Sequence, residues 1–222
     1  MYENRRKKLI YGSWLVAMAL LVIVAGCGQQ FGAILYHLGA GQNKKVEAEF
    51  QFPVTPLLIL VDDDWDLVRP RTACDLLVDL LANELRQRGL AERVTSNDEL
   101  AKLRLAHANF DERGAREIGQ LAQADTILWL QIKRFALPDD LDRVMTPVPF
   151  ALTVKVLDAN AEKRDEVRLW PKTREGHTVE IEVSPYDLRQ CKDMRQAHEL
   201  MATQMAGDIA KLFYTHRTEP GT

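Results

Sequence analysis

The run LLILV, from Leu57 to Val61, is the stretch that decides the fold of this chain. A short continuous apolar run suits a strand that is buried on both faces, in a sheet covered by helices. Pro70 then opens a predicted helix that reaches about Arg88 and stops at Gly89. A buried strand followed closely by a helix is typical of an α/β fold.

Helix and strand signals continue to alternate through the middle of the chain. A short strand is predicted at 92–95, and Ser96 with Glu99 forms a capping box for a helix through about His107. Another helix is predicted over about 112–123, followed by a strong strand signal at 126–135. These early units favour parallel pairing of the strands.

The second half of the chain favours antiparallel hairpins. Strands are predicted at 149–158, 167–170 and 177–183, the last with the most regular alternation. A long helix from about Leu188 to Tyr214 then closes the domain, and its methionines Met194, Met201 and Met205 recur at helical spacing, as core residues do. The predicted fold is therefore α/β, with a single mixed sheet and helices packed on it.

Length and composition indicate one folded domain. The chain has 222 residues, of which 46% are hydrophobic and 27% charged. The predicted boundaries are 1–26 for a signal peptide, 27–52 for a lipidated cysteine and tether, 53–216 for the α/β domain and 217–222 for a tail. The tract 46–52 alternates and predicts an edge strand. The net charge is −3 although residues 1–26 are positive, so the rest is acidic and a nucleic-acid partner is excluded.

Residues 1–27 have the order of a secretory leader. Four basic residues at 5–8 precede an apolar run from Leu9 to Ala25, and the run ends in Val24-Ala25-Gly26-Cys27. This tetrapeptide resembles the lipobox of bacterial lipoproteins, and the resemblance implies that Cys27 becomes the first mature residue and carries acyl chains. The alternative is an uncleaved signal anchor, for which a run of about 17 residues is near the lower limit. Either anchor predicts a membrane-attached domain outside the cytoplasm, in the periplasm, and leaves inner or outer membrane open.

Two segments of the domain resemble a known family. They are IGQLAQADTILWL, from Ile118 to Leu130, and the stretch from Val154 through Asp158 to Trp170. Together they resemble the periplasmic lipoprotein domains related to the curli secretion protein CsgG and to the N-terminal domain of TolB, and they are similar to planctomycete-type envelope proteins. The resemblance covers about residues 55–215. It implies a role in envelope assembly or as a scaffold, without enzyme activity.

The acidic cluster that follows the first buried strand is the one candidate site for chemistry. In open α/β sheets, ligands bind beyond the carboxyl ends of the strands. Carboxylates there are hard oxygen ligands for Mg²⁺ or Ca²⁺, which makes Asp62, Asp64 and Asp66 candidate metal ligands. The alternative is a charged loop beside a helix N-terminus, whose dipole stabilises negative charge.

The cysteines and histidines indicate no catalytic centre. Cys74 and Cys191 permit one disulfide, although the apolar helical setting of Cys74 favours a buried free thiol. No histidine pair has zinc-site spacing, and His198 is interpreted as a residue on the flank of the last helix. The sequence predicts no cofactor and no catalytic residue.

The sequence therefore predicts a non-enzymatic, lipid-anchored envelope protein that acts through contacts with other envelope proteins. Two alternatives stay open: a metal-dependent hydrolase that uses the cluster at 62–66, and a ligand- or lipid-binding module. The sequence also leaves open whether the domain forms a homo-oligomer.

Overall fold

The computed structural model of the chain describes residues 44–53, 55–63 and 65–218. The predicted signal peptide, Cys27 and residues 219–222 lie outside this part. The chain divides into a large unit, Glu47–His216, and a small one whose described residues are 44–46 and 217–218. β1 (Lys45–Val46) and β7 (His216–Arg217) form a two-stranded sheet. Within the described residues, no helix is long and apolar enough to cross a membrane.

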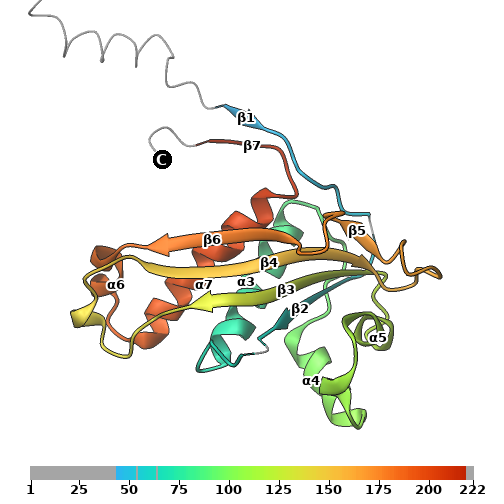
Figure 1. The fold of residues 1–222 in the computed structure, drawn as a ribbon, viewed down its shortest axis with the longest axis horizontal. Coiled ribbons are helices and arrows are strands. Elements are labelled where there is room, and N and C mark those ends of the chain that lie inside the picture. Colours follow the sequence, from blue (N-terminus) through green and yellow to red (C-terminus); the bar gives the residue numbers. More distant parts are fainter. Residues whose placement is uncertain (1–43, 54, 64, 219–222) are drawn as a thin grey trace, which may run out of the picture. The chain divides into compact units, whose positions relative to one another are not determined.

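The large unit is built on a mixed five-stranded sheet, which confirms the predicted fold class (Figure 1). β2 (Leu57–Asp62) pairs in parallel with β3 (Thr126–Phe135), and β3 pairs antiparallel with β4 (Val148–Asp158). β5 (Arg168–Trp170) and β6 (His177–Val183) both pair antiparallel with β4. Because β3 pairs with one edge of β4 over residues 150–158, the other two strands share the opposite edge.

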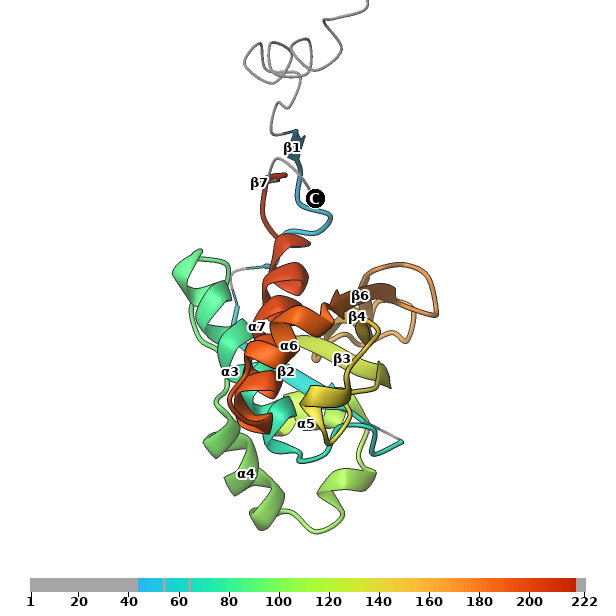
Figure 2. The same ribbon diagram turned by 90° about the vertical axis from the view of Figure 1, so that its left-hand side faces the viewer.

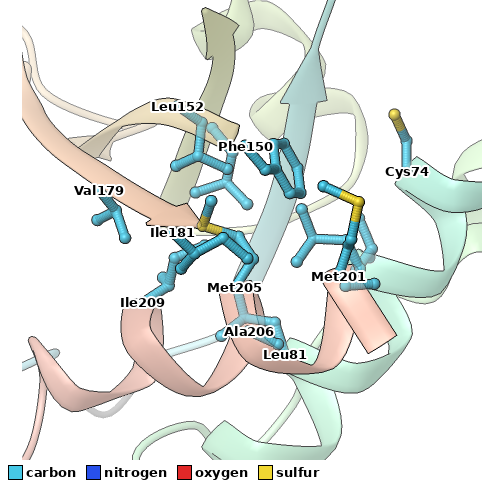
Figure 3. Close-up of a cluster of buried hydrophobic side chains, with 14 of the residues drawn as sticks. Cys74, Leu81, Phe150, Leu152, Val179, Ile181, Met201, Met205, Ala206 and Ile209 are labelled. Carbon is cyan, nitrogen blue, oxygen red and sulfur yellow. The ribbon is translucent and has the colours of Figure 1, made fainter. Parts of the chain in front are cut away.

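Helices α3 (Thr72–Gln87) and α7 (Met194–Lys211) cover one face of the sheet (Figures 1 and 2). They run in the same direction, since the N-terminal halves of both helices line one cavity and Arg88, after α3, lies over the ring of Tyr214, after α7. Figure 3 shows the core between α7 and the sheet. Each large aliphatic side chain buried there contributes about 1.5–3 kcal/mol. They include Leu81, Leu152, Val179, Ile181, Met205 and Ile209.

The second face of the sheet is only partly covered. Helices α4 (Asn97–Ala106) and α5 (Ala115–Leu121), with the 3-10 turn η1 (Phe110–Glu112), pack near β2 and the start of β3. Gly119 permits this close approach, because a Cβ there would lie 2.4 Å from Cδ1 of Ile127. Over the remaining β3, β4 and β6 surface, the described residues place no helix (Figure 1).

Several local predictions are confirmed. The strand at 126–135 and the strand at 177–183 have their expected bounds. Ser96 and Glu99 make both bonds of the capping box at the start of α4. The short strand expected at 92–95 is reduced to a single parallel bridge between Val94 and Leu57.

The prediction of one helix from 188 to 214 is wrong. The chain forms α6 (Pro185–Gln190), adopts an extended conformation at Cys191 and starts α7 at Met194. The side chain of Asp193 accepts a hydrogen bond from the backbone N–H of Gln196 at 2.8 Å, so it caps a new helix.

The prediction of an edge strand over 46–52 is also wrong, because β1 ends at Val46. The backbone N–H groups of Glu49 and Phe50 both donate to the carbonyl of Leu212, at 2.8 and 3.3 Å. The apolar alternation of this tract instead reflects Phe50 and Phe52, which pack onto the core as partly buried rings.

Candidate functional site

In the acidic loop after β2, the carboxylates of Asp63 and Asp66 bind other groups of the same loop. Both carboxylate oxygens of Asp63 accept backbone N–H groups, from Leu67 and Val68, at 2.9 Å each. Asp66 has a positive φ of 50° and forms an exposed ion pair with Arg69. Of the three predicted metal ligands, Asp62 ends β2, Asp66 is exposed on the loop, and Asp64 lies outside the described residues. Within the described part of the chain, no three His, Cys, Asp or Glu side chains form a group that could hold a metal.

A groove lies where the sequence placed the site, at the carboxyl end of β2. It consists of two adjoining cavities of about 350 and 300 Å³, which share Leu60, Val61, Arg71 and Arg104. One lies between α3 and α4, and the other reaches η1, the start of α5 and Trp129. The strand order places this groove at the edge of the sheet, as expected for an open α/β fold.

The groove carries charges of both signs. Arg104 forms an ion pair with Asp111 at 2.8 Å, and its guanidinium lies over the ring of Phe110 at 5.3 Å. Arg113 and Trp129 each have a ring or guanidinium nitrogen, Nε and Nε1, that is buried without a hydrogen-bond partner. Such unsatisfied donors are costly in a folded protein. A groove with balanced charges and spare donors suits a polar ligand with acceptor groups better than a simple anion.

A buried lysine lies beside the groove on the second face of the sheet. Lys155 is 8% exposed, its Nζ donates to Oε1 of Gln131 at 2.8 Å, and it lies 4.9 Å from the centre of the Trp129 ring. Burial, followed by the charges of Arg168 and Lys133, lowers the pKa of Lys155. In the sequence, Lys155 is one of the polar positions of an alternating strand. The missed signal is that β4 has neighbours on both edges, so its polar side chains are enclosed by those of other strands.

The two predicted cysteines of the domain are both free thiols. Cys74 is buried in the first turn of α3, and Cys191 is half-buried after α6. Burial, with the nearby Asp63 carboxylate, raises the pKa of Cys74 to about 11. Burial also raises the pKa of Cys191. Raised thiol pKa values mean few thiolates and therefore low nucleophilic reactivity.

Three large apolar side chains are strongly exposed on segments that precede α3, β4 and α7. Trp65 is 76% exposed, Met145 80% and Tyr186 66%. Trp65 belongs to the loop that leads into α3, and Tyr186 belongs to α6, which precedes α7. A guanidinium nitrogen of Arg189 donates to the carbonyl of Val144 at 2.7 Å, which joins α6 to the loop of Met145. We call the surface of Trp65, Met145 and Tyr186 the apolar tip.

The described residues thus form a mixed α/β domain with a polar groove and an apolar tip. No family model matches this chain, and no curated protein matches it. Solved structures that align with it include a PelC variant dodecamer from Paraburkholderia phytofirmans, at 10% identity and a TM-score of 0.43, over 77% of this chain and 97% of that one.

Two further solved structures also align with the chain. The lipoprotein GNA1162 from Neisseria meningitidis aligns at 12% identity and a TM-score of 0.39, over 72% of this chain and 99% of that one. TolB from Acinetobacter baumannii aligns at 14% identity and a TM-score of 0.29, over 75% of this chain and 30% of that one. Similarity at this level carries no argument about ligand, partner or assembly. The kinship with CsgG, with the N-terminal domain of TolB and with planctomycete-type proteins stays a prediction.

Proposed function

We propose that this protein is a lipid-anchored protein of the cell envelope that holds a partner protein at its apolar tip, without catalysing a reaction. The basic and apolar leader that ends in Val24-Ala25-Gly26-Cys27 supports the anchor. The proposed role is assembly, scaffolding or trafficking in the periplasm.

The observation that carries the proposal is the position of the apolar tip relative to the start of the large unit. The chain joins this unit next to the end of α7, where the N–H of Glu49 donates to the carbonyl of Leu212. The apolar tip lies at the beginning of α7, whose 18 residues span about 27 Å. A domain tethered through its N-terminal segment is therefore attached at one end and presents Trp65, Met145 and Tyr186 at the other.

These three side chains have the character of interface anchors. Aromatic residues and methionine are enriched at the cores of protein interfaces, where truncation of an anchor costs more than about 2 kcal/mol of binding energy. Single exposed apolar residues are common on soluble proteins. Here the segments of Met145 and Tyr186 are joined through Arg189, and Trp65 lies on the loop that leads into α3, so we infer that the three form one candidate contact surface.

Position-specific photo-crosslinking in cells tests the proposal. A photoreactive residue placed at 65, 145 or 186 should capture the same protein, whereas one at Leu105 should not. Leu105 is the matched control because it is 89% exposed but lies on α4. Capture of one protein from all four positions, or from none, would contradict the proposal. Intact-mass measurement should show loss of residues 1–26 and added acyl mass on Cys27, and an unmodified full-length chain would reject the lipid anchor.

The groove favours a second candidate function, a ligand-binding module. Its support is the pair of unpartnered donors, Arg113 Nε and Trp129 Nε1, on one cavity wall. Arg104→Ala and Arg113→Ala should then abolish a ligand-dependent rise in melting temperature and leave crosslinking at the tip intact. The hydrolase alternative predicts that Mg²⁺ or Ca²⁺ raises the melting temperature and that Asp62→Asn removes the effect.

A further inference from the structure

β2 pairs with β3 on one edge, and its other edge faces the groove. Along that second edge the described chain makes a single bridge. In this bridge the N–H of Leu57 donates to the carbonyl of Arg93, and the N–H of Thr95 donates to the carbonyl of Leu57, at 2.9 Å each. The chain then turns into α4, which Ser96 caps. Because the bridge is parallel, this edge accepts a strand that runs in the direction of β2.

The backbone groups of Ile59 and Val61 face the same way as those of Leu57. In a parallel ladder, alternate residues direct both their N–H and their C=O to one side. Leu57 directs its two groups away from β3, whereas the carbonyl of Pro56 accepts from the N–H of Asp125, next to β3, at 3.0 Å. None of the described residues forms a hydrogen bond with Ile59 or Val61 on the groove side. Backbone groups at a strand edge need water or another strand as a partner.

The cavity of about 350 Å³ gives this edge room for a ligand. The consecutive residues Ile59, Leu60 and Val61 line it, and α3 and α4 form its other walls. Figure 1 shows β2 as the strand of the sheet nearest to α4. No residue of α4 is buried, so this helix has surface available for a ligand. A cavity of this size is within the range of binding sites and holds a few residues of extended chain.

The charged side chains of the groove differ between its two ends. Asp98 lies in the first turn of α4, and Asp75 lies near it, since its carbonyl accepts from Nδ2 of Asn97 at 3.0 Å. Arg104 lies in the last turn of α4, where the second cavity begins. Arg71 lines both cavities and forms no ion pair with any residue that the structure describes. The wall of the second cavity has three arginines and two aspartates: Arg71, Arg104, Arg113, Asp62 and Asp111.

We propose that the groove binds the C-terminus of an extended partner peptide, which adds to the free edge of β2 as a parallel strand. Addition of a strand to a sheet edge is a common mode of peptide recognition, as is capture of a terminal carboxylate. The parallel direction places the carboxylate beyond Val61, near Arg71 and Arg104. The opposite direction would bring an N-terminal ammonium to the same arginines. This inference names a ligand for the second candidate function and rests on it.

The ladder fixes which backbone groups of the peptide bind. The N–H of its third-last residue donates to the carbonyl of Ile59, and the carbonyl of that residue accepts from the N–H of Val61. The N–H of the last residue donates to the carbonyl of Val61. The N–H of the second-last residue points away from β2. Asp75 and Asp98, at the other end of the groove, favour Lys or Arg upstream of these three residues.

The test uses the full chain in detergent and a random library of peptides displayed with free C-termini. A selected peptide is then synthesised as the acid and as the C-terminal amide. The amide should bind roughly 10- to 100-fold more weakly, because a charged hydrogen-bond partner is lost. Arg71→Ala should weaken binding of the acid by at least about 10-fold and change binding of the amide little. The matched control is Arg86→Ala, an exposed arginine in the last turn of α3, which should bind both forms as the parent chain does.

N-methylation of the peptide distinguishes strand addition from simple binding of an anion. A methyl group on the last or third-last amide should weaken binding by about 3- to 10-fold, since one hydrogen bond to β2 is lost. A methyl group on the second-last amide is the matched control and should be tolerated. A library without enriched peptides, equal affinity of acid and amide, or losses that do not depend on the methylated position would each overturn the inference.

Failure of this inference can be distinguished from failure of the functions proposed above. A different polar ligand that raises the melting temperature of the parent chain but not of Arg113→Ala would preserve the ligand-binding module without a peptide. Crosslinking at positions 65, 145 and 186 does not involve the groove, so its outcome bears only on the apolar tip.

Discussion

The ammonium of Lys155 and the side-chain oxygen of Gln131 are joined by a 2.8 Å hydrogen bond across the ladder of β3 and β4. Trp129, the direct cross-strand neighbour of Lys155, lies beneath the same ammonium. Gly176 contributes by having no side chain, since a Cβ there would lie 2.9 Å from Cε of Lys155. These contacts allow a lysine to occupy a strand that has neighbours on both edges.

Gln131→Leu should destabilise the large unit by about 1–3 kcal/mol, because the ammonium of Lys155 loses its acceptor while it stays buried. Urea denaturation measures the change. Lys155→Met removes the charge together with the need for an acceptor, so the double variant should recover most of the lost stability. An additive double variant would show that the two side chains are not coupled. Because burial lowers the pKa of Lys155 in the folded state, the penalty in Gln131→Leu should fall as the pH rises through that pKa toward 10.5.

His198 should make the domain less stable in acid. Burial lowers its pKa below 6.5 in the folded state, with an opposing hydrogen bond to the backbone of Met194. Below pH 6.5 the unfolded chain therefore binds a proton that the folded chain does not, and stability falls until the folded pKa is reached. Melting temperatures measured across this range should fall less steeply in His198→Phe than in the parent chain. Parallel slopes would contradict the assignment, whatever the absolute stability of the variant.

Gly119→Ala should destabilise the domain by about 1–3 kcal/mol through overpacking. The added Cβ would meet Cδ1 of Ile127 at 2.4 Å and its Cγ1 at 2.7 Å, and Ile127 is fully buried, so its side chain has to shift within a packed core. Gly207→Ala is the matched control in α7, where a Cβ meets nothing within 4 Å. That change should stabilise the protein by roughly 0.5–1 kcal/mol through helix propensity. Ile127→Val should partly rescue Gly119→Ala, and failure to do so would place the strain elsewhere.

The two thiols of the domain should differ in reactivity. Cys191 is half-buried and Cys74 is buried with a pKa of about 11, so native labelling at neutral pH should modify Cys191 first. Peptide mapping by mass spectrometry under non-reducing conditions should recover Cys74 and Cys191 on separate peptides. A linked peptide would instead support the disulfide that the sequence permits. Urea should equalise the two labelling rates, which separates burial from intrinsic reactivity.

Elements with a strong local signal could be read directly from the residues. The strands at 126–135 and 177–183 follow from apolar periodicity, and the start of α4 follows from the Ser96–Glu99 capping box. These features depend on neighbours within a few residues, so the local sequence determines them. The leader that ends at Cys27 is likewise a local pattern, and it supports a prediction about location.

Features that depend on distant neighbours could not be predicted in this way. The sequence predicts a candidate metal site in the acidic loop after β2. Whether Asp63 binds an ion or the backbone N–H groups of Leu67 and Val68 depends on how this loop turns. The break between α6 and α7 could not be predicted either. The apolar residues predict one continuous helix, whereas Asp193 caps a new helix after α6 has ended.

The sequence by itself determined the α/β class and the main strands, and it predicts an envelope leader, because each of these is a property of consecutive residues. The tertiary structure decided which side chains meet: Lys155 with Gln131, and Arg104 with Asp111 at the groove. The physical reason is that burial and donor geometry depend on which strand or helix lies alongside. Helices α3 and α7 are more than 100 residues apart in the chain and become neighbours only because both pack on the same face of the sheet.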